Sequence, residues 1–308
     1  MSSPVKIAVI GVGKLGSKHA EVYSKLPGVE LVGVCDSSES RAKEVAFHCK
    51  TKASTHFKDF IGKVDAVSIV VPSSKHFEIS KEFLEHNIHV LIEKPITATL
   101  KEADELLEIA GKKNLTIQVG HIERFNSAFR AIKSVIKAPR FIECHRLGPY
   151  DPRVVDVGVT LDLMIHDIDI VLDMVRSPIK HVDSVGAFIL SKTEDIANAR
   201  IRFENNCVCD LTASRVTKDV MRKIRIFQDD AYISIDYVTQ EVLIYTKENG
   251  GIHHKKIDIT RSDSLKEELS DFIRCLRENK KPLVSGEEGR QALALALQIS
   301  KEIKDSQH

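Results

Sequence analysis

The sequence lacks an excess of charge of either sign. Its 45 lysines and arginines stand against 44 aspartates and glutamates, a net charge of +1. Without a dominant positive field, nucleic-acid binding is not expected. No apolar run reaches the roughly 20 residues that a bilayer-spanning helix needs, so no membrane span is expected either. The apolar residues 5–10 are interpreted as a strand rather than as part of a signal peptide.

The six cysteines show neither the spacing of a disulfide framework nor that of a zinc knuckle. They are Cys35, Cys49, Cys144, Cys207, Cys209 and Cys275. Cys207 and Cys209, which share one predicted strand, are interpreted as small apolar side chains. The H-E-x-x-H zinc motif is also absent, so no metal is expected. Scattered thiols are typical of the reducing cytosol, and a cytoplasmic protein is predicted.

A glycine fingerprint follows the first predicted strand. Residues 11–16 read GVGKLG and open a predicted helix. In this pattern Gly11 allows a tight turn, Gly13 lets backbone N–H groups reach a pyrophosphate, and Gly16 lets helix and strand pack closely. The helix N-terminus attracts the phosphate charge, and Lys14 and Leu15 are expected to line the same site.

Asp36 ends the next apolar run, 20 residues after Gly16. At this distance a carboxylate can accept hydrogen bonds from the adenosine ribose of a dinucleotide. The same charge would repel a 2′-phosphate, so the predicted cofactor is NAD, with NADP less favoured.

The first 120 residues alternate apolar strands with helices, which is typical of a parallel sheet. After about residue 122 a helix over 126–137, a strand over 141–147 and a long helix over 159–175 are predicted. Several strand-like runs follow, among them residues 184–190, joined by polar connectors such as Asn249-Gly250-Gly251. We therefore expect an α/β chain: a doubly wound Rossmann domain over 1–122, then an α+β domain with a mostly antiparallel sheet over 123–308.

Two groups of residues are candidates for a catalytic role. Lys94 follows the apolar strand that ends at Glu93, and ligands of parallel sheets bind at the carboxyl ends of strands; a surface lysine is the alternative. Pro95, which follows it, could carry a cis peptide bond.

Asp162 and His166 are four positions apart on a predicted helix and would share a face, so that the carboxylate can support the imidazole as a base. A helix-surface Asp162 with a core histidine, or a metal site that includes Asp169, are the alternatives.

The chain resembles the Gfo/Idh/MocA family of nicotinamide-dependent sugar oxidoreductases. The resemblance runs nearly end to end and rests on IAVIGVGKLGSKHA, the VPSSKH turn at 71–76, HVLIEKPI, VGHIERFN and LDLMIHDID. It implies that Lys94, Asp162 and His166 are catalytic. It also implies that Val71, Ser73, His76 and Glu93 line the cofactor site together with Lys94. The family's C-terminal sheet carries substrate on one side and subunit contacts on the other, and its final helix usually packs back on the Rossmann domain.

The segment GHIERFN at 120–126 is similar to that of nucleotide-sugar 3-dehydrogenases, among them UDP-N-acetylglucosamine 3-dehydrogenases. In that interpretation Arg124 or Asn126 helps to hold the sugar or its diphosphate. Pairing of Arg124 inside the protein is the equal alternative.

The expected function is therefore an NAD-dependent oxidation of a secondary sugar hydroxyl, most specifically C3 of UDP-N-acetylglucosamine. A homo-oligomer, dimer or tetramer, is expected. One alternative is a dehydrogenase of a free aldose or inositol. Another is a nicotinamide-binding regulator without catalysis.

Overall fold

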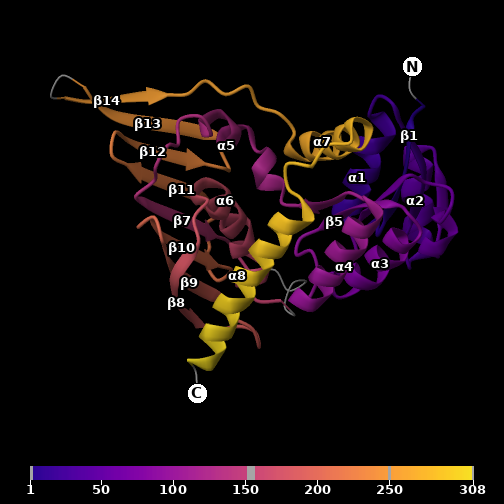
Figure 1. Cartoon of the computed structure of the whole chain (residues 1–308), viewed down its shortest axis with the longest axis horizontal. Coiled ribbons are helices and arrows are strands. Elements are labelled where there is room, and N and C mark those ends of the chain that lie inside the picture. The colour runs from indigo at the N-terminus through magenta and orange to yellow at the C-terminus, as the bar shows by residue number, and fades with distance from the viewer. Residues whose placement is uncertain (1–2, 151–156, 249–250, 307–308) are drawn as a thin grey trace. The chain divides into compact units, whose positions relative to one another are not determined.

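The computed structural model describes residues 3–150, 157–248 and 251–306 (Figure 1). They form two compact units, one of Met1–Ile122 with Asp263–Arg290 and one of Glu123–Ser262 with Gln291–His308. The sequence prediction placed residues 123–308 in one domain, with the last helix packing back on the Rossmann domain. In the structure Asp263–Arg290 belongs to the first unit, and the chain from Gln291 onward belongs to the second. The predicted connector at Asn249 and Gly250 lies outside the described residues.

The first unit is built on a six-stranded parallel sheet in the order β3-β2-β1-β4-β5-β6. Its strands are β1 (Val5–Ile10), β2 (Val29–Cys35), β3 (Lys52–Ser54), β4 (Ala66–Ile69), β5 (His89–Glu93) and β6 (Ile117–Gly120). The central strands are continuous apolar runs because helices cover both of their faces. The doubly wound prediction is confirmed, although the short edge strand β3 was not foreseen.

Five helices and two short 3-10 turns of the described residues pack in this unit with the sheet. They are α1 (Lys14–Lys25), α2 (Glu39–Cys49), α3 (His76–Glu85), α4 (Leu100–Lys113) and, from late in the chain, α7 (Ser264–Glu278), with short 3-10 turns η1 (Phe57–Phe60) and η2 (Ser73–Lys75). The predicted capping box opens α4, since Thr99 and Glu102 each accept the other's backbone N–H. Helix α7 joins this unit because Leu269 and Phe272 are buried in its core.

The second unit contains an eight-stranded sheet in the order β14-β13-β12-β11-β7-β10-β9-β8, whose pairs are antiparallel except β7 with β10. Its strands are β7 (Phe141–Leu147), β8 (Ile179–Ala187), β9 (Ile196–Phe203), β10 (Val208–Ser214), β11 (Met221–Gln228), β12 (Ala231–Asp236), β13 (Glu241–Glu248) and β14 (Gly251–Lys256). The mostly antiparallel sheet is thus confirmed.

Among the described residues, one face of this sheet packs on helices and the other carries no helix (Figure 1). The covering elements are α5 (Ser127–Ile132), a π-helical turn η5 (Thr160–Met164), α6 (Ile165–Val175) and the part of α8 (Gly286–Asp305) from Gln291 onward; the 3-10 turn η3 (Ile122–Phe125) precedes them. Side chains alternate accordingly, with Ile142 and Cys144 of β7 fully buried. None of the helices in the described part of the chain is long and apolar enough to cross a membrane.

Two predicted elements differ from the structure. The strand expected over 184–190 ends at Ala187, because Asp195 accepts the backbone N–H groups of Ile189 and Leu190. The helix expected over 126–137 ends at Ile132, and the amide of Gln228 pairs with backbone groups in the segment beyond it. In both cases a side chain outside the predicted element, nearby in sequence for Asp195 and distant for Gln228, competes with regular backbone pairing.

Candidate functional site

The glycine turn after β1 has the geometry of a phosphate-binding loop. Gly11 has a φ of +87°, and a Cβ there or at Gly16 would overlap backbone oxygens. A Cβ at Gly13 would meet no atom within 4 Å, so open space lies beside this residue. Helix α1 begins at Lys14 without a side-chain cap and without an acidic residue in its first turn, which leaves its N–H groups and positive dipole end for an anion.

Asp36 lies beside this turn at the end of β2 and is buried. Its Oδ2 accepts the N–H of Val12 at 2.9 Å, and its Oδ1 accepts the N–H of Ser38 at 2.9 Å. Arg41 donates to the same carboxylate at 3.2 Å, although its own side chain is half exposed. Sequence reasoning missed Arg41; a basic residue one helical turn after Asp36 is the signal that could have found it. Arg41 bears on the choice of cofactor, because an arginine near this carboxylate can also pair with the 2′-phosphate of NADP.

His76 ties the loop after β4 to the turn after β5. Its buried ring lies between two carbonyl oxygens, with Nδ1 2.8 Å from that of Pro95 and Nε2 2.9 Å from that of Val71. Burial lowers the pKa of His76 despite these two acceptors, so the neutral ring donates to one of them at a time. Ser73 begins the 3-10 turn that leads to this histidine.

Glu93 ends strand β5, Lys94 follows it directly, and the Lys94–Pro95 peptide is cis. The Glu93 carboxylate is nearly buried, lies 3.3 Å from Nε2 of His19 and accepts the N–H of Lys94. Burial raises the pKa of Glu93, but the neighbouring His19 and Lys94 outweigh it and hold the pKa below its usual value. His19, one turn beyond Gly16 on α1, is a further residue that the motif analysis missed. Lys94 itself is half-buried.

Asp162 and His166 lie on consecutive helical elements of the second unit. Asp162 is in the π turn η5 and His166 is in the first turn of α6, and both side chains are half-buried. Single π turns inside helices are frequent at functional sites. The sequence predicted one continuous helix here; the extra width of its first turn could not be read from the spacing.

A buried charge cluster anchors α6 to β7. Arg146 pairs with Asp167 through two hydrogen bonds of 3.0 and 2.8 Å and with Glu123 at 3.0 Å. Burial raises the pKa of Asp167 even though the guanidinium opposes this. The cluster fixes the helix directly after His166, and no motif in the sequence pointed to it.

Arg124 and Asn126 have partners inside the second unit. Arg124 is buried and pairs with Asp169, at 2.9 Å, and with Asp173. Burial raises the pKa of Asp173, but Arg124 and two further cations lower it to about 2. Asn126 caps α5 through the N–H of Ala128. The structure thus contains the internal pairing that was one of the two interpretations of Arg124; a contact of either residue with substrate stays a prediction.

Each unit therefore assembles its own part of the predicted site. The first gathers the glycine turn, Asp36, His76, Glu93 and Lys94, and the second carries Asp162 and His166. Within residues 3–150, 157–248 and 251–306, no group of three or more His, Cys, Asp or Glu side chains is arranged to hold a metal ion.

A glycine turn with an acidic partner, followed by an α+β unit, defines a dinucleotide-dependent enzyme class, and comparison with known proteins agrees. The family model described as "Oxidoreductase family, NAD-binding Rossmann fold" matches residues 5–121, and the Gfo/Idh/MocA C-terminal domain matches residues 132–234. The chain belongs to the Gfo/Idh/MocA oxidoreductase family.

Several relatives cover nearly the whole chain. UDP-N-acetylglucosamine 3-dehydrogenase of Acidithiobacillus ferrooxidans is 35% identical over 302 residues, 96% of each chain, and its solved structure superposes with a TM-score of 0.94 over 99% of both chains. Myo-inositol 2-dehydrogenase of Thermotoga maritima is 26% identical over 98% of this chain and 97% of its own length. The scyllo-inositol dehydrogenase of Lactobacillus casei, solved with NAD(H), shares the fold at 21% identity, with a TM-score of 0.84 over 99% of this chain and 98% of its own.

Proposed function

We propose that this protein is an NAD-dependent dehydrogenase that oxidises the C3 hydroxyl of UDP-N-acetylglucosamine to a ketone. The observation that carries the proposal is the 35% identity over 96% of the chain to an enzyme named for that reaction. The glycine turn and the half-buried Lys94, Asp162 and His166 supply the residue types that the reaction needs.

The first unit fits the cofactor. Gly13 leaves room for a pyrophosphate beside the N-terminus of α1, and Asp36 presents a buried carboxylate near the same turn. Val71, Ser73 and His76 would line the site, with Lys94 near the reacting end. Because Asp36 accepts hydrogen bonds and repels phosphate, NAD is the proposed cofactor.

Oxidation of a secondary alcohol removes a proton from oxygen and a hydride from carbon. The bound nicotinamide supplies the hydride acceptor. His166 accepts the hydroxyl proton as the carbonyl forms, and Asp162 stabilises the imidazolium that results. Lys94 donates to the same oxygen and orients it.

The direct test is NADH formation by the purified protein from UDP-N-acetylglucosamine, UDP-glucose, free N-acetylglucosamine and myo-inositol. We expect kcat/KM to be highest for UDP-N-acetylglucosamine, and a 3-keto product. His166→Ala should lower kcat by about 100-fold or more, the range of general-base catalysis, while NAD still binds. Near-normal turnover of that variant would reject the mechanism, and absence of activity on every UDP-sugar would reject the substrate.

A second candidate substrate is an inositol, because myo-inositol 2-dehydrogenase of Thermotoga maritima also aligns over 98% of this chain. Higher kcat/KM for myo-inositol than for any UDP-sugar would favour it. A regulator that binds NAD without turnover is the remaining alternative, and it would require that no polyol or sugar yields NADH.

We further propose a cytoplasmic homo-oligomer that uses the uncovered face of the second unit's sheet. A row of rings crosses this face: Phe227 stacks on Tyr232 at 4.8 Å between centroids, and Tyr232 stacks on Tyr245 at 5.2 Å. Light scattering should give a mass of two or four chains, whereas a monomer at micromolar concentration would contradict the proposal.

A further inference from the structure

The chain that enters the π turn is held on both sides of Gly158. The carbonyl of Val157 accepts a hydrogen bond of 2.7 Å from Nη1 of Arg215, and the N–H of Val159 donates to the carbonyl of Glu194 at 3.0 Å. The next backbone bond, from the N–H of Asp162 to the carbonyl of Gly158 at 3.0 Å, begins the helical turn itself. The start of the helix is thus fixed from outside the helix.

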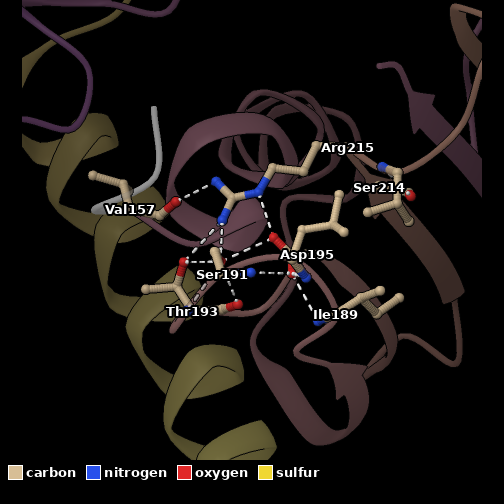
Figure 2. A network of polar contacts seen from close by, with 9 residues as sticks. Val157, Ile189, Ser191, Thr193, Asp195, Ser214 and Arg215 are labelled. Carbon is tan, nitrogen blue, oxygen red and sulfur yellow. Dashed lines mark hydrogen bonds and ion pairs between the residues drawn. The ribbon is translucent and has the colours of Figure 1, made fainter. Parts of the chain in front are cut away.

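Arg215 is the centre of this attachment (Figure 2). It is buried at the end of β10, and its Nε donates to Oδ1 of Asp195 at 2.8 Å. Its Nη2 donates to the hydroxyls of Ser191, at 2.7 Å, and Thr193, at 2.9 Å. Because a guanidinium is planar, the partners of Nε and Nη2 also fix the direction of Nη1. Nη1 in turn donates to the carbonyl of Val157.

Asp195 is fully buried and makes the support rigid. Its Oδ2 accepts the N–H groups of Ile189, Leu190 and Ser191 at 2.7, 2.6 and 3.0 Å. Burial raises the pKa of Asp195, yet the N–H groups and Arg215 together lower it well below its ordinary value. The carboxylate therefore stays charged and keeps the guanidinium in one orientation.

Glu194 provides the second support. Its side chain lies so close to Gly158 that a Cβ there would overlap the carboxylate, and Oε1 accepts the hydroxyl of Ser300 at 2.7 Å. Position 158 therefore accepts only glycine unless Glu194 is displaced.

We propose that Arg215, oriented by Asp195 and Thr193, is a positioning group that sets where the helix bearing Asp162 and His166 begins. This inference rests on the proposed function, since it gives the attachment a role in presenting those two residues to the hydroxyl. A change in the start of the helix moves both side chains together, and displacements of about 1 Å in catalytic groups can cost about 100-fold in rate.

The test compares Thr193→Val with Thr193→Ser. Valine has the shape of threonine but removes one acceptor of Arg215, and serine restores it. Arg215→Lys keeps the charge beside Asp195 but loses the planar fork. The control is Arg140→Lys, which changes an exposed arginine paired with Asp229 in the same unit.

The measured quantity is the single-turnover rate of NADH formation from UDP-N-acetylglucosamine, per bound NAD. We expect it to fall about fivefold in Thr193→Val, the effect of one lost hydrogen bond, and about 10- to 100-fold in Arg215→Lys. Thr193→Ser and Arg140→Lys should keep the wild-type rate, and the Kd of NAD should not change. If Arg215 only stabilised the fold, the variants would have fewer NAD-binding sites but the same rate per site. That result would overturn the proposal, and so would equal rates in Thr193→Val and Thr193→Ser.

Amide hydrogen exchange separates this inference from the proposed function. If the wild-type protein oxidises no substrate, the function fails, but the attachment can still be measured. Exchange at the amides of Val159 and Asp162 should be about fivefold faster in Thr193→Val than in Thr193→Ser. Equal exchange in the two variants would show that Arg215 does not hold this segment.

Discussion

Replacing Asp36 tests how the cofactor is held. Its carboxylate spans the turn, with one oxygen on the N–H of Val12 and the other on the N–H of Ser38. Each oxygen has a second lone pair, and Arg41 occupies that side now. Since Arg41 is half exposed, it can move aside for a ribose diol while both backbone bonds stay in place.

The magnitude follows from the bonds that the carboxylate would make. A hydrogen bond to a charged acceptor contributes about 1.5–3 kcal/mol. A tenfold change in Kd corresponds to 1.36 kcal/mol, so the loss of one such bond in Asp36→Ala should raise the Kd of NAD about 10- to 150-fold. Asp36→Asn keeps an oxygen for Val12 but removes the charge, so NAD should weaken by about tenfold or less. NADP should bind more tightly to Asp36→Asn, because Arg41 can then pair with the 2′-phosphate without a competing anion.

Calorimetric Kd values for NAD and NADP, measured on the wild type, both Asp36 variants and Arg41→Ala, check this reasoning. Arg41→Ala is the matched control. It should leave the Kd of NAD within about twofold, because an ion pair whose guanidinium is half exposed is worth little. It should weaken NADP binding, because the arginine that can pair with the 2′-phosphate is lost. An unchanged Kd of NAD in Asp36→Ala would refute the assignment of the carboxylate to the ribose.

Three further predictions concern buried charges and a close contact. Arg146→Met should lower the free energy of unfolding in urea by about 3–5 kcal/mol, since Asp167 loses its buried partner; a loss under about 1 kcal/mol would contradict this. The pKa of Asp173, about 2, is depressed by its cationic neighbours, so its stabilisation is full above the ordinary value of 3.8 and is lost as the pH falls toward 2. Thermal midpoints of Asp173→Asn and the wild type should therefore differ at pH 6 and converge near pH 2; a constant difference would exclude this linkage. Gly120→Ala places a Cβ 2.8 Å from the Glu93 carboxylate and should lower the free energy of unfolding in the same urea assay by about 1–3 kcal/mol. An unchanged urea midpoint would contradict this.

Much of the fold could be read from local patterns. Strand β7 has the predicted bounds, Phe141–Leu147, because its side chains alternate between a buried and a more exposed face. The glycine turn was predicted because each glycine has a separate steric reason. Strand β3, with three residues at a sheet edge, has no periodicity long enough to detect.

The remaining differences come from side-chain contacts that no periodic pattern encodes. Asp195 and Arg41 are each only five residues from the groups that they bind, Leu190 and Asp36, yet this spacing does not predict that the bonds form. Likewise, Arg124 carried two equally plausible interpretations until its partners Asp169 and Asp173 were placed. Composition and spacing suggest which residue types could act, but the choice of partner is a property of the folded chain.

The most direct test of the central claim is a crystal structure of the protein with NAD and UDP-N-acetylglucosamine bound. The account predicts that Nζ of Lys94 and a ring nitrogen of His166 both lie within about 3.2 Å of the C3 hydroxyl, with the Asp162 carboxylate beside the imidazole. A complex in which another hydroxyl faces the nicotinamide, or in which any of the three side chains points away from it, would contradict the account.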